Sequence, residues 1–284
     1  MSAVQPFVIG ATGMVGGAIV RRLIAEGAQP IGLSRQSRSG DGVSWVAGDL
    51  EDLGRALLPS LDVVFATAPV GRVADAVPVL AAAGMTRLVV FTSTSIETKW
   101  DTSDPEERAF IRDWGAGEAR VIAACAAHNI GCTVLRPTLI YLEGRDGNVS
   151  RIAGLIRRFR FFPLMAGGEG LRQPVHTDDL AAAAVAAAAR QQSIGKIYNL
   201  PGGETLTYRE MVGRIFDGLG LPRIIVPVPD WAWRMILPVA VRVLPGLSAT
   251  MATRMAKNMT FDAGPAAAEL GFQPREFRPQ FRSL

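Results

Sequence analysis

The stretch that most constrains the fold is Gln5–Arg22, which reads QPFVIGATGMVGGAIVRR. A short apolar run over 7–9 ends at Gly10, then Gly13 and Gly16 follow at three-residue spacing, and apolar residues recur at helical period. This order predicts a strand, a tight turn and a helix. The turn of such a unit presents backbone N–H groups and the positive end of a helix dipole, which together suit a pyrophosphate.

Each glycine of this turn has its own expected task in a dinucleotide-binding unit. Gly10 lets the chain leave the strand sharply, Gly13 lets a phosphate approach the backbone, and Gly16 lets the helix pack close to the strand. The alternative is a glycine-rich turn in an α/β domain that binds nothing. The candidate cofactor residues of the turn are Gly10, Thr12, Gly13, Met14, Val15 and Gly16.

Strand-like and helix-like segments alternate through the first half of the chain, which predicts a parallel sheet with right-handed crossovers. Further strands are expected at 30–33, 43–47, 62–66, 87–91, 133–135 and 196–200, helices at 52–58, 73–83, 105–128, 148–159 and 207–219, and a loop at 161–170. We therefore predict an α/β fold, a Rossmann-type doubly wound parallel sheet with a small C-terminal substrate lobe. Residues 1–284 are expected to form one unit, with a dinucleotide-binding core over about 1–138 and mainly substrate lobe, with returning core elements, over about 139–284.

The end of the second strand separates the two nicotinamide cofactors. An acidic residue there binds the ribose 2′-OH of NAD(H), whereas an arginine accommodates the 2′-phosphate of NADP(H). The chain has Ser34 and Arg35 at this point, Arg38 three residues later, and no acidic residue before Asp41. We expect NADP(H) to be favoured over NAD(H), with an ordinary surface role for Arg35 as the alternative.

The third expected strand is closed by the sequence Gly48-Asp49-Leu50. Asp49 is placed to meet the adenine amine of a bound dinucleotide, with Leu50 beside it. Alternatively, Asp49 caps the helix expected at 52–58, and one carboxylate could serve both purposes.

Composition excludes several function classes. The net charge is +4 and the pI about 9.5, but the basic residues are scattered, so no nucleic-acid partner is expected. Cys125 and Cys132 lack metal-ligand spacing and are expected to be buried free thiols, and His128 and His176 are too few for a histidine-based metal site. No secretory signal precedes the first strand, so a cytoplasmic location is expected.

No segment has the pattern of a membrane span. The apolar run at 180–189 is too short, and the run at 231–251 is interrupted by two arginines and two prolines. The second run suits a buried helix pair that covers a substrate pocket. It would also suit contact with a membrane surface or a partner protein.

Five short sequences together carry a resemblance to a known family. They are GATGMVG (10–16), GDL (48–50), VVFTSTS (89–95), LRPTLIY (135–141) and GLRQPVHTDDLA (170–181). In this order they resemble the extended short-chain dehydrogenase/reductases, in the epimerase/dehydratase branch, over about the first two-thirds of the chain. The resemblance implies that helix-pair homodimers are possible.

The resemblance also implies roles for residues that follow the fourth, fifth and sixth strands. It places Thr67, Ala68 and Pro69 along the nicotinamide ribose, Pro137 and Thr138 beside the nicotinamide, Thr92 near the cofactor, and Thr94 at the position of the family's catalytic hydroxyl.

The chain departs from the family where proton transfer is concerned. The family uses a Tyr and a Lys four residues later, because a phenol with a pKa near 10 needs a fixed cation to react near neutral pH. None of Tyr141, Tyr198 and Tyr208 is followed by Lys at that spacing. At the expected helix position the chain reads DWGAGEAR (113–120), with Trp114 for the phenol and Gly117 or Glu118 for the cation.

Four other residues are possible substitutes for the missing pair. Thr94 is a hydroxyl without an assisting base, and Lys99 lies on the loop after the fifth strand, where a solvated lysine is the ordinary expectation. Tyr141 has Arg145 four residues on, which would assist a phenol from an unusual position in the sheet. Glu118 would be an acid if burial raised its pKa, although a helix-surface role is the simpler expectation.

The substrate indications conflict. In nucleotide-sugar members of the family, an Arg in the position of Arg172 binds substrate phosphates, but Leu139 stands where those members carry an Asn. A salt bridge from Arg172 to Asp178 or Asp179 is an equally good interpretation. For His176, packing and a hydrogen bond at a helix start are expected rather than catalysis.

We therefore expect an atypical NADP(H)-dependent oxidoreductase or epimerase, and keep one alternative. The expected enzyme acts on a carbonyl or hydroxyl substrate, apolar or anionic, and the strand-end hydroxyls and the apolar second lobe favour it. The alternative is a catalytically silent NADP(H)-binding sensor or assembly subunit. Relatives that lack the Tyr/Lys pair include such proteins, among them a subunit of respiratory complex I, and the missing pair favours this alternative.

Overall fold

A computed structural model of the chain describes residues 5–40, 42–55, 58–98, 102, 104–229, 232, 255 and 257–281. The chain divides into two compact units, which we treat separately. Unit 1 comprises residues 1–138, 177–200 and 261–273, and unit 2 comprises residues 139–176, 201–260 and 274–284.

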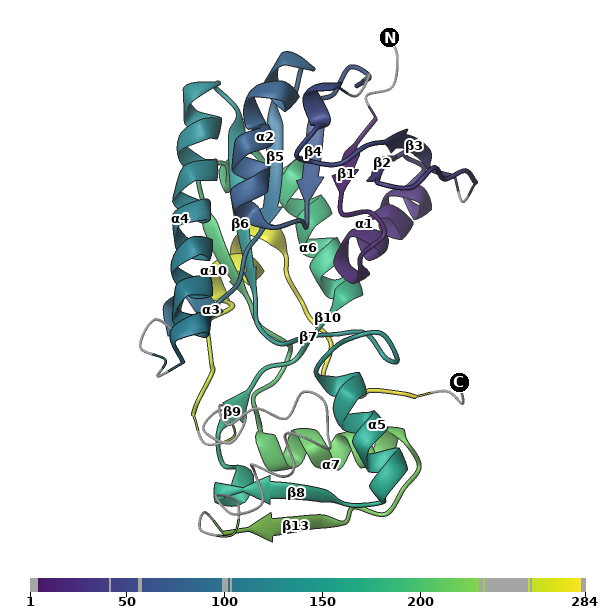
Figure 1. Cartoon of the computed structure of the whole chain (residues 1–284), viewed down its shortest axis with the longest axis vertical. Coiled ribbons are helices and arrows are strands. Elements are labelled where there is room, and N and C mark those ends of the chain that lie inside the picture. The colour runs from purple at the N-terminus through teal and green to yellow at the C-terminus, as the bar shows by residue number, and fades with distance from the viewer. Residues whose placement is uncertain are drawn as a thin grey trace. The chain divides into compact units, whose positions relative to one another are not determined.

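Unit 1 is built on a seven-stranded sheet in which every pairing is parallel (Figure 1). In spatial order the strands are β11 (Ile197–Leu200), β6 (Gly131–Pro137), β5 (Arg87–Phe91), β4 (Val63–Ala66), β1 (Phe7–Ile9), β2 (Ile31–Ser34) and β3 (Ser44–Ala47). The strand order reverses between β1 and β4, and ligands of open α/β sheets bind at the carboxyl ends of the strands at such a reversal.

Helices cover both faces of this sheet (Figure 1). Helices α1 (Met14–Ala25) and α6 (Thr177–Ala189) pack against each other on one face, and α2 (Val70–Ala82) and α4 (Pro105–Ala127) pack together on the other. The short helices of unit 1 are η1 (Leu53–Arg55), α3 (Ser95–Thr98), η3 (Gln191–Ser193) and α10 (Gly264–Leu270). Strands β1, β2 and β5 are buried along their whole length, as a sheet covered on both faces requires.

Local chemistry fixes where α4 begins. Asp104 precedes the helix, and its carboxylate accepts hydrogen bonds from the backbone N–H groups of Glu106 (3.0 Å) and Glu107 (3.2 Å). Pro105 occupies the first helical position, where its missing N–H costs nothing. From there α4 runs antiparallel to β5 and β6, with Trp114 and Glu118 in its middle turns.

The described part of unit 2 contains two helices and short paired strands. The helices are α5 (Val149–Phe159) and α7 (Tyr208–Gly218), and η2 (Ala166–Gly168) is a single turn. The strand pairs are β7 (Ile140–Tyr141) with β10 (Val175–His176), β9 (Leu171–Arg172) with β12 (Leu206–Thr207), and β8 (Phe162–Met165) with β13 (Ile225–Val228). A capping box between Thr207 and Glu210 starts α7, as the sequence predicts.

The predicted α/β Rossmann-type fold is confirmed, with three local differences. The helix expected at 52–58 is the single 3₁₀ turn η1 within the described residues, because Asp49 closes the chain there into a tight turn. The loop expected at 161–170 contains β8, since Phe162 and Leu164 alternate into the core of unit 2. Helix α2 begins at Val70, three residues earlier than predicted, directly after Pro69.

Some predictions fall on residues that the structure does not describe. These are the roles of Asp41 and Lys99 and nearly all of the apolar run at 231–251. In the part of the chain that is described, no helix is both long and apolar enough to cross a membrane.

Candidate functional site

The first turn of unit 1 has the geometry that its three glycines predict. Gly10 adopts a φ of +82°, a left-handed conformation that side chains disfavour, and turns the chain off β1. A Cβ on Gly16 would lie 2.1 Å from the carbonyl oxygen of Gly10, so only glycine lets α1 start so close to the strand. The Thr67 hydroxyl lies in the space that these two glycines leave and donates to the carbonyl oxygens of Ile9 (3.1 Å) and Gly10 (3.4 Å).

The N-terminus of α1 is open to a ligand on its outer side. Gly13 is the N-cap residue, and no side chain caps the first turn of the helix. Thr12 and Gly13 are exposed and Met14 is half-buried, whereas Val15 is packed into the core and would contribute only its backbone. A helix start with unpaired N–H donors and no acidic residue in its first turn suits an anion.

The end of β2 presents two arginines. Ser34 is buried, and its hydroxyl donates to the carbonyl of Gln36 (2.8 Å), which fixes the turn that follows the strand. Arg35 and Arg38 are exposed just beyond it, and the Arg38 guanidinium lies 5.6 Å from the centre of the Trp45 ring. Arg35 makes no ion pair among the described residues, so its guanidinium is available to an anion.

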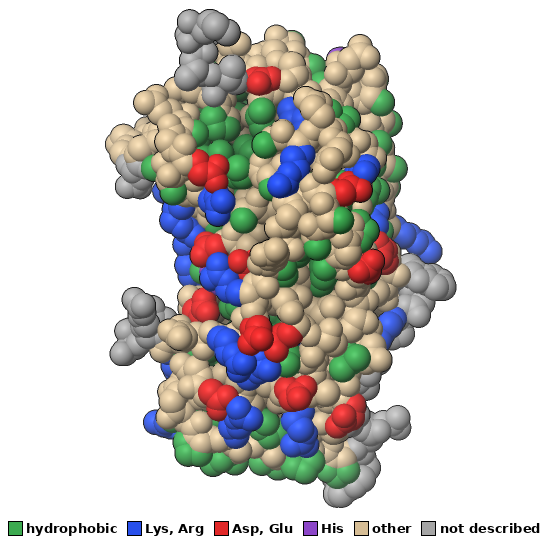
Figure 2. Space-filling view, turned by 180° about the vertical axis from the view of Figure 1, so that it is seen from behind, with side chains coloured by type: hydrophobic (Ala, Val, Ile, Leu, Met, Phe, Trp, Pro, Cys, Tyr) green, Lys and Arg blue, Asp and Glu red, His purple; other side chains and the backbone are tan. Residues whose placement is uncertain are grey.

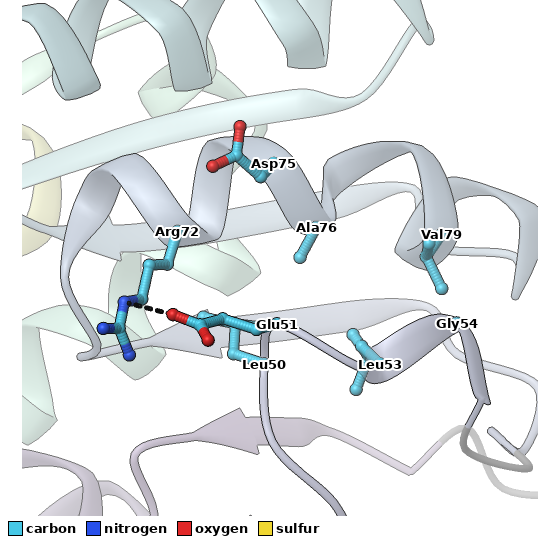
Figure 3. A pocket seen from close by; sticks show the side chains of 8 residues that line it. All are labelled: Leu50, Glu51, Leu53, Gly54, Arg72, Asp75, Ala76 and Val79. Atoms are coloured by element: carbon cyan, nitrogen blue, oxygen red, sulfur yellow. Dashed lines mark ion pairs between the residues drawn. The ribbon is translucent and has the colours of Figure 1, made fainter.

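Asp49 and Leu50 follow β3 as predicted. The Asp49 carboxylate accepts from the N–H of Glu51 at 3.3 Å, in the turn that precedes η1, and Leu50 is buried. Beside them a hollow of about 340 Å³ lies between this segment and α2 (Figure 3). Figure 3 shows Arg72 reaching from α2 toward Glu51, and the two form an ion pair at 3.1 Å. The hollow opens on the α2 side of Leu50.

The residues after β4, β5 and β6 lie at the same edge of the sheet. Ala68 is half-buried, Pro69 is exposed at the start of α2, and Thr138 donates its N–H to the carbonyl of Leu200 (3.3 Å). Thr94 is 3 % exposed, and its hydroxyl donates to the carbonyl of Pro137 at 3.1 Å. The Thr94 hydroxyl, which the resemblance places at the family's catalytic position, therefore donates its hydrogen bond to a backbone oxygen.

A buried ion pair occupies the α4 side of this edge. Glu118 is 5 % exposed, which contradicts the helix-surface expectation. Its carboxylate accepts from the Thr92 hydroxyl (2.7 Å), from Arg136 Nε (3.0 Å) and from Arg136 Nη2. The other Nη of Arg136 pairs with Glu97 of α3. The Glu118 hydrogen bond raises the pKa of Arg136, with smaller contributions from Glu97, so the guanidinium stays charged.

Position 117, directly before Glu118 in the sequence, has no room for a lysine side chain. A Cβ on Gly117 would lie 2.9 Å from the backbone nitrogen of Gly71 and from Val70 Cγ1, because α4 packs directly on the start of α2. Trp114 is half-buried against the core, with its ring 4.9 Å from that of Phe110. The helix that carries the family's Tyr and Lys thus carries an indole, a glycine that must stay small and a carboxylate.

Tyr141 lies in the core of unit 2. It is 1 % exposed, and its ring makes edge-on contacts at 5.0 Å with His176 and with Phe277. His176 is 7 % exposed, and its Nε2 lies 3.4 Å from a carboxylate oxygen of Glu143. Burial alone would raise the pKa of Glu143, but hydrogen bonds from His176 and from backbone N–H groups hold it below its usual range. The ring contacts pack His176 in the core of unit 2, where it also pairs with Glu143. The burial of Tyr141 argues against an acid–base role for it.

Arg172 is built into unit 2. It is 4 % exposed, its Nη1 donates to the carbonyl oxygens of Leu171 (2.6 Å) and Lys257 (2.7 Å), and its guanidinium lies 5.6 Å from the Tyr208 ring centre. Burial raises the pKa of Tyr208 to about 12, and the Arg172 charge offsets part of that rise. These interactions tie β9 to its neighbours and leave little of the side chain for a substrate phosphate.

Sequence reasoning missed Arg136, although one signal was present. An arginine inside a strand that is otherwise buried needs a carboxylate partner, and Glu118 is a carboxylate on a helix that covers that sheet. The stacking of Arg38 on Trp45 was also missed. Among the described residues, no three His, Cys, Asp or Glu side chains come together as metal ligands.

Comparison with known proteins identifies the family. A model of the NAD dependent epimerase/dehydratase family matches residues 7–200, which contain all seven strands of the main sheet and the glycine turn. The chain belongs to this family. It is therefore a member of a nicotinamide-dinucleotide-binding family with a Rossmann fold.

Individual relatives are more distant. An uncharacterized protein, y4nG of Sinorhizobium fredii, is 28% identical over 162 residues, or 56% of this chain and 40% of that protein. Subunit 9 of the NADH dehydrogenase [ubiquinone] 1 alpha subcomplex of Arabidopsis thaliana is 37% identical over 87 residues, or 30% of this chain and 21% of that protein. The chain thus spans less than half the length of these curated relatives.

Among solved structures, the UDP-glucuronic acid 4-epimerase of Bacillus cereus in complex with UDP-glucuronic acid and NAD has the same fold. Its TM-score is 0.71 at 15% identity, with 96% of this chain and 95% of that chain covered. At this identity the likeness extends to the fold alone.

Proposed function

We propose that this chain binds NADP(H) in unit 1 and holds it without the acid–base pair that its family uses for catalysis. The observation that carries the proposal is the buried Glu118–Arg136 pair on the α4 side of the strand ends. Both oxygens of this carboxylate accept from one guanidinium and one also accepts from the Thr92 hydroxyl, so the side chain is committed to its neighbours rather than to a substrate. The role is that of a cofactor-binding sensor or assembly subunit.

The proposal that unit 1 binds NADP(H) rests on the first turn and the end of β2. The glycines, the uncapped start of α1 and the exposed Arg35 supply a pyrophosphate cradle and a cation for a 2′-phosphate. No acidic residue stands between Ser34 and Gly40 to bind a 2′-OH or to repel a phosphate. These features favour NADP(H) over NAD(H).

The proposal that the chain is catalytically silent gains support from a relative. A relative that matches 87 residues of this chain is named as a subunit of NADH dehydrogenase, which supports an assembly role as part of the proposal. The Thr94 hydroxyl donates to the Pro137 carbonyl and Tyr141 is buried, so neither of these two candidates supports replacement of the missing pair.

The test measures turnover of candidate substrates by protein for which NADPH binding has been demonstrated. Purified protein saturated with NADPH is mixed with a panel of aldehydes, ketones and nucleotide sugars, and the nicotinamide absorbance is followed. Exchange of deuterium from labelled NADPH is measured in parallel. We expect saturable binding with no oxidation or exchange above the protein-free rate. Turnover that follows saturation kinetics would instead establish an atypical oxidoreductase or epimerase, and Thr94 and Lys99 would be the first residues to substitute.

A further inference from the structure

One face of unit 2 combines positive charge with exposed aromatic rings. Between Val149 and Pro163 the chain contains four arginines and no acidic residue. Arg157, Arg158 and Arg160 at the end of α5 are all exposed, and none pairs with a carboxylate among the described residues. Several other exposed arginines of the described chain do form ion pairs, among them those of α1 and α2.

Large apolar side chains lie exposed within the same face. Phe159 and Phe161 are 39% and 41% exposed, with their ring centres 6.4 Å apart. Ile224, just before β13, is 49% exposed, and Val226, within β13, is 42% exposed. We call these four residues, with Arg157, Arg158 and Arg160, the basic–aromatic face.

Strand pairing brings the two apolar groups side by side. The N–H of Phe162 donates to the carbonyl of Ile224 at 2.9 Å, and Val226 is the register partner of Pro163. Because side chains alternate along a strand, Phe162 and Leu164 point into the core of unit 2 while the residues between them face outward. Figure 2 shows hydrophobic side chains gathered at the edge of the molecule where Figure 1 places β8 and β13.

The arginines and the rings are also in contact. The Arg158 guanidinium lies 5.2 Å from the ring centre of Phe159, and that of Arg157 lies 5.7 Å from the ring centre of Phe281. Arginine side chains of this kind lay their apolar stems along aromatic surface and keep their charge at the rim. The result is an apolar patch with a positive border.

We propose that the basic–aromatic face docks this protein on the surface of an anionic lipid bilayer. A bilayer offers phosphates at the depth of the arginines and acyl chains just below them, at the depth of the phenylalanines. A nucleic acid would match the charge, and its bases could stack on the two rings, but it would not cover the aliphatic side chains of Ile224 and Val226. A second copy in a two-fold dimer would bring the same three arginines together, which like-charge repulsion opposes.

The experiment is flotation of the full-length protein with vesicles. Vesicles of phosphatidylcholine alone are compared with vesicles rich in phosphatidylglycerol, at low and at high salt. We expect binding to the phosphatidylglycerol vesicles only, with release at high salt because the arginines lie at the surface. Binding to neither kind of vesicle would overturn the proposal.

Two sets of variants locate the contact. Arg158→Gln with Arg160→Asn removes two charges, and Asn tolerates the left-handed φ of 65° at position 160. Each lost charge is expected to weaken vesicle partition about fivefold, which corresponds to about 1 kcal/mol per arginine near an anionic surface. Phe161→Ser is expected to weaken it further without changing the salt dependence.

Matched controls come from α4. Arg112 is exposed and Phe110 is 57% exposed, so Arg112→Gln and Phe110→Ser remove the same chemistry from unit 1. Both controls should bind vesicles like the wild type, and thermal unfolding checks that all variants fold. Equal loss in the controls and in the face variants would overturn the proposal. Self-association that Phe161→Ser abolishes would also overturn it, because a second copy would then cover the face.

Discussion

The two ends of the strand edge in unit 1 differ in what they do with their polar groups. At the β1–β2 end, glycines, an uncapped helix start and Arg35 leave donors and charge facing outward. At the β5–β6 end, Thr92, Thr94, Glu118 and Arg136 all bond to one another or to backbone. The polar groups of the first end face outward, and those of the second are paired with one another or with backbone.

This contrast shows how a family member can keep one half of a site and close the other. Nucleotide binding depends on backbone geometry, which the glycines preserve whatever happens on α4. In the proposed function the turn is kept, while Trp114 and Gly117 or Glu118 stand where the family has its Tyr and Lys.

Removing the Glu118 carboxylate from the β5–β6 end should cause the largest loss of stability. Glu118→Ala leaves the Arg136 guanidinium, only 15% exposed, with Glu97 as its remaining partner. We expect the free energy of unfolding in urea to fall by about 3–5 kcal/mol, the usual cost of removing one partner of a buried ion pair.

Two controls accompany this variant. The double substitution Glu118→Leu with Arg136→Leu removes both charges and should recover most of the loss. Glu26→Ala breaks an exposed pair with Arg22 and should cost less than about 1 kcal/mol. A Glu118→Ala cost as small as the Glu26→Ala cost would mean that the pair does not hold this end together.

Charge removal at the open end should alter binding rather than stability. Arg35→Ala is expected to weaken NADPH binding by about 1.5–3 kcal/mol, the value of a charged hydrogen bond to phosphate, and to leave NADH binding nearly unchanged. Fluorescence titration measures both affinities, with Arg112→Ala as the control for loss of an exposed arginine. Equal weakening toward both cofactors would show that Arg35 does not bind the 2′-phosphate.

Steric change in the turn tests the backbone geometry. Gly16→Ala places a Cβ 2.1 Å from the Gly10 carbonyl oxygen, so the turn must shift. We expect a loss of about 1–3 kcal/mol in unfolding free energy together with weaker NADPH binding. Gly154→Ala in α5 is the control: its Cβ meets nothing within 4 Å, and it should stabilise by up to about 1 kcal/mol through helix propensity. Similar effects at both positions would contradict the close approach seen at Gly16.

The smallest effect is expected from a half-buried carboxylate in unit 2. Glu143 has a pKa below its usual range because of His176 and backbone donors, despite the opposing effect of burial. A depressed folded-state pKa stabilises the fold above the unfolded pKa of about 4.3, and this stabilisation is lost as pH falls through the folded value. Glu143→Gln should therefore cost on the order of 1 kcal/mol at neutral pH and progressively less in acid. Urea midpoints across a pH series would show this, and a pH-independent difference would contradict it.

Sequence predicted the backbone geometry of the glycine turn and missed the contacts of the closed end, for a physical reason. The glycine turn and the residues after β2 are local, so spacing alone carries their meaning. The Glu118 environment is assembled from α4, the end of β5 and β6, and only the fold brings Thr92 and Arg136 to the carboxylate. The same holds for Arg172, whose partners at Leu171 and Lys257 include one far along the chain.

The most direct test of the account is a calorimetric titration of the purified protein with NADPH and NADH side by side. We predict that NADPH binds at one site per chain and more tightly than NADH, because the first turn holds the pyrophosphate of either cofactor and Arg35 adds a contact to one alone. Tighter binding of NADH would contradict the assignment of Arg35. Binding of neither cofactor would contradict the central claim that unit 1 keeps a working dinucleotide site.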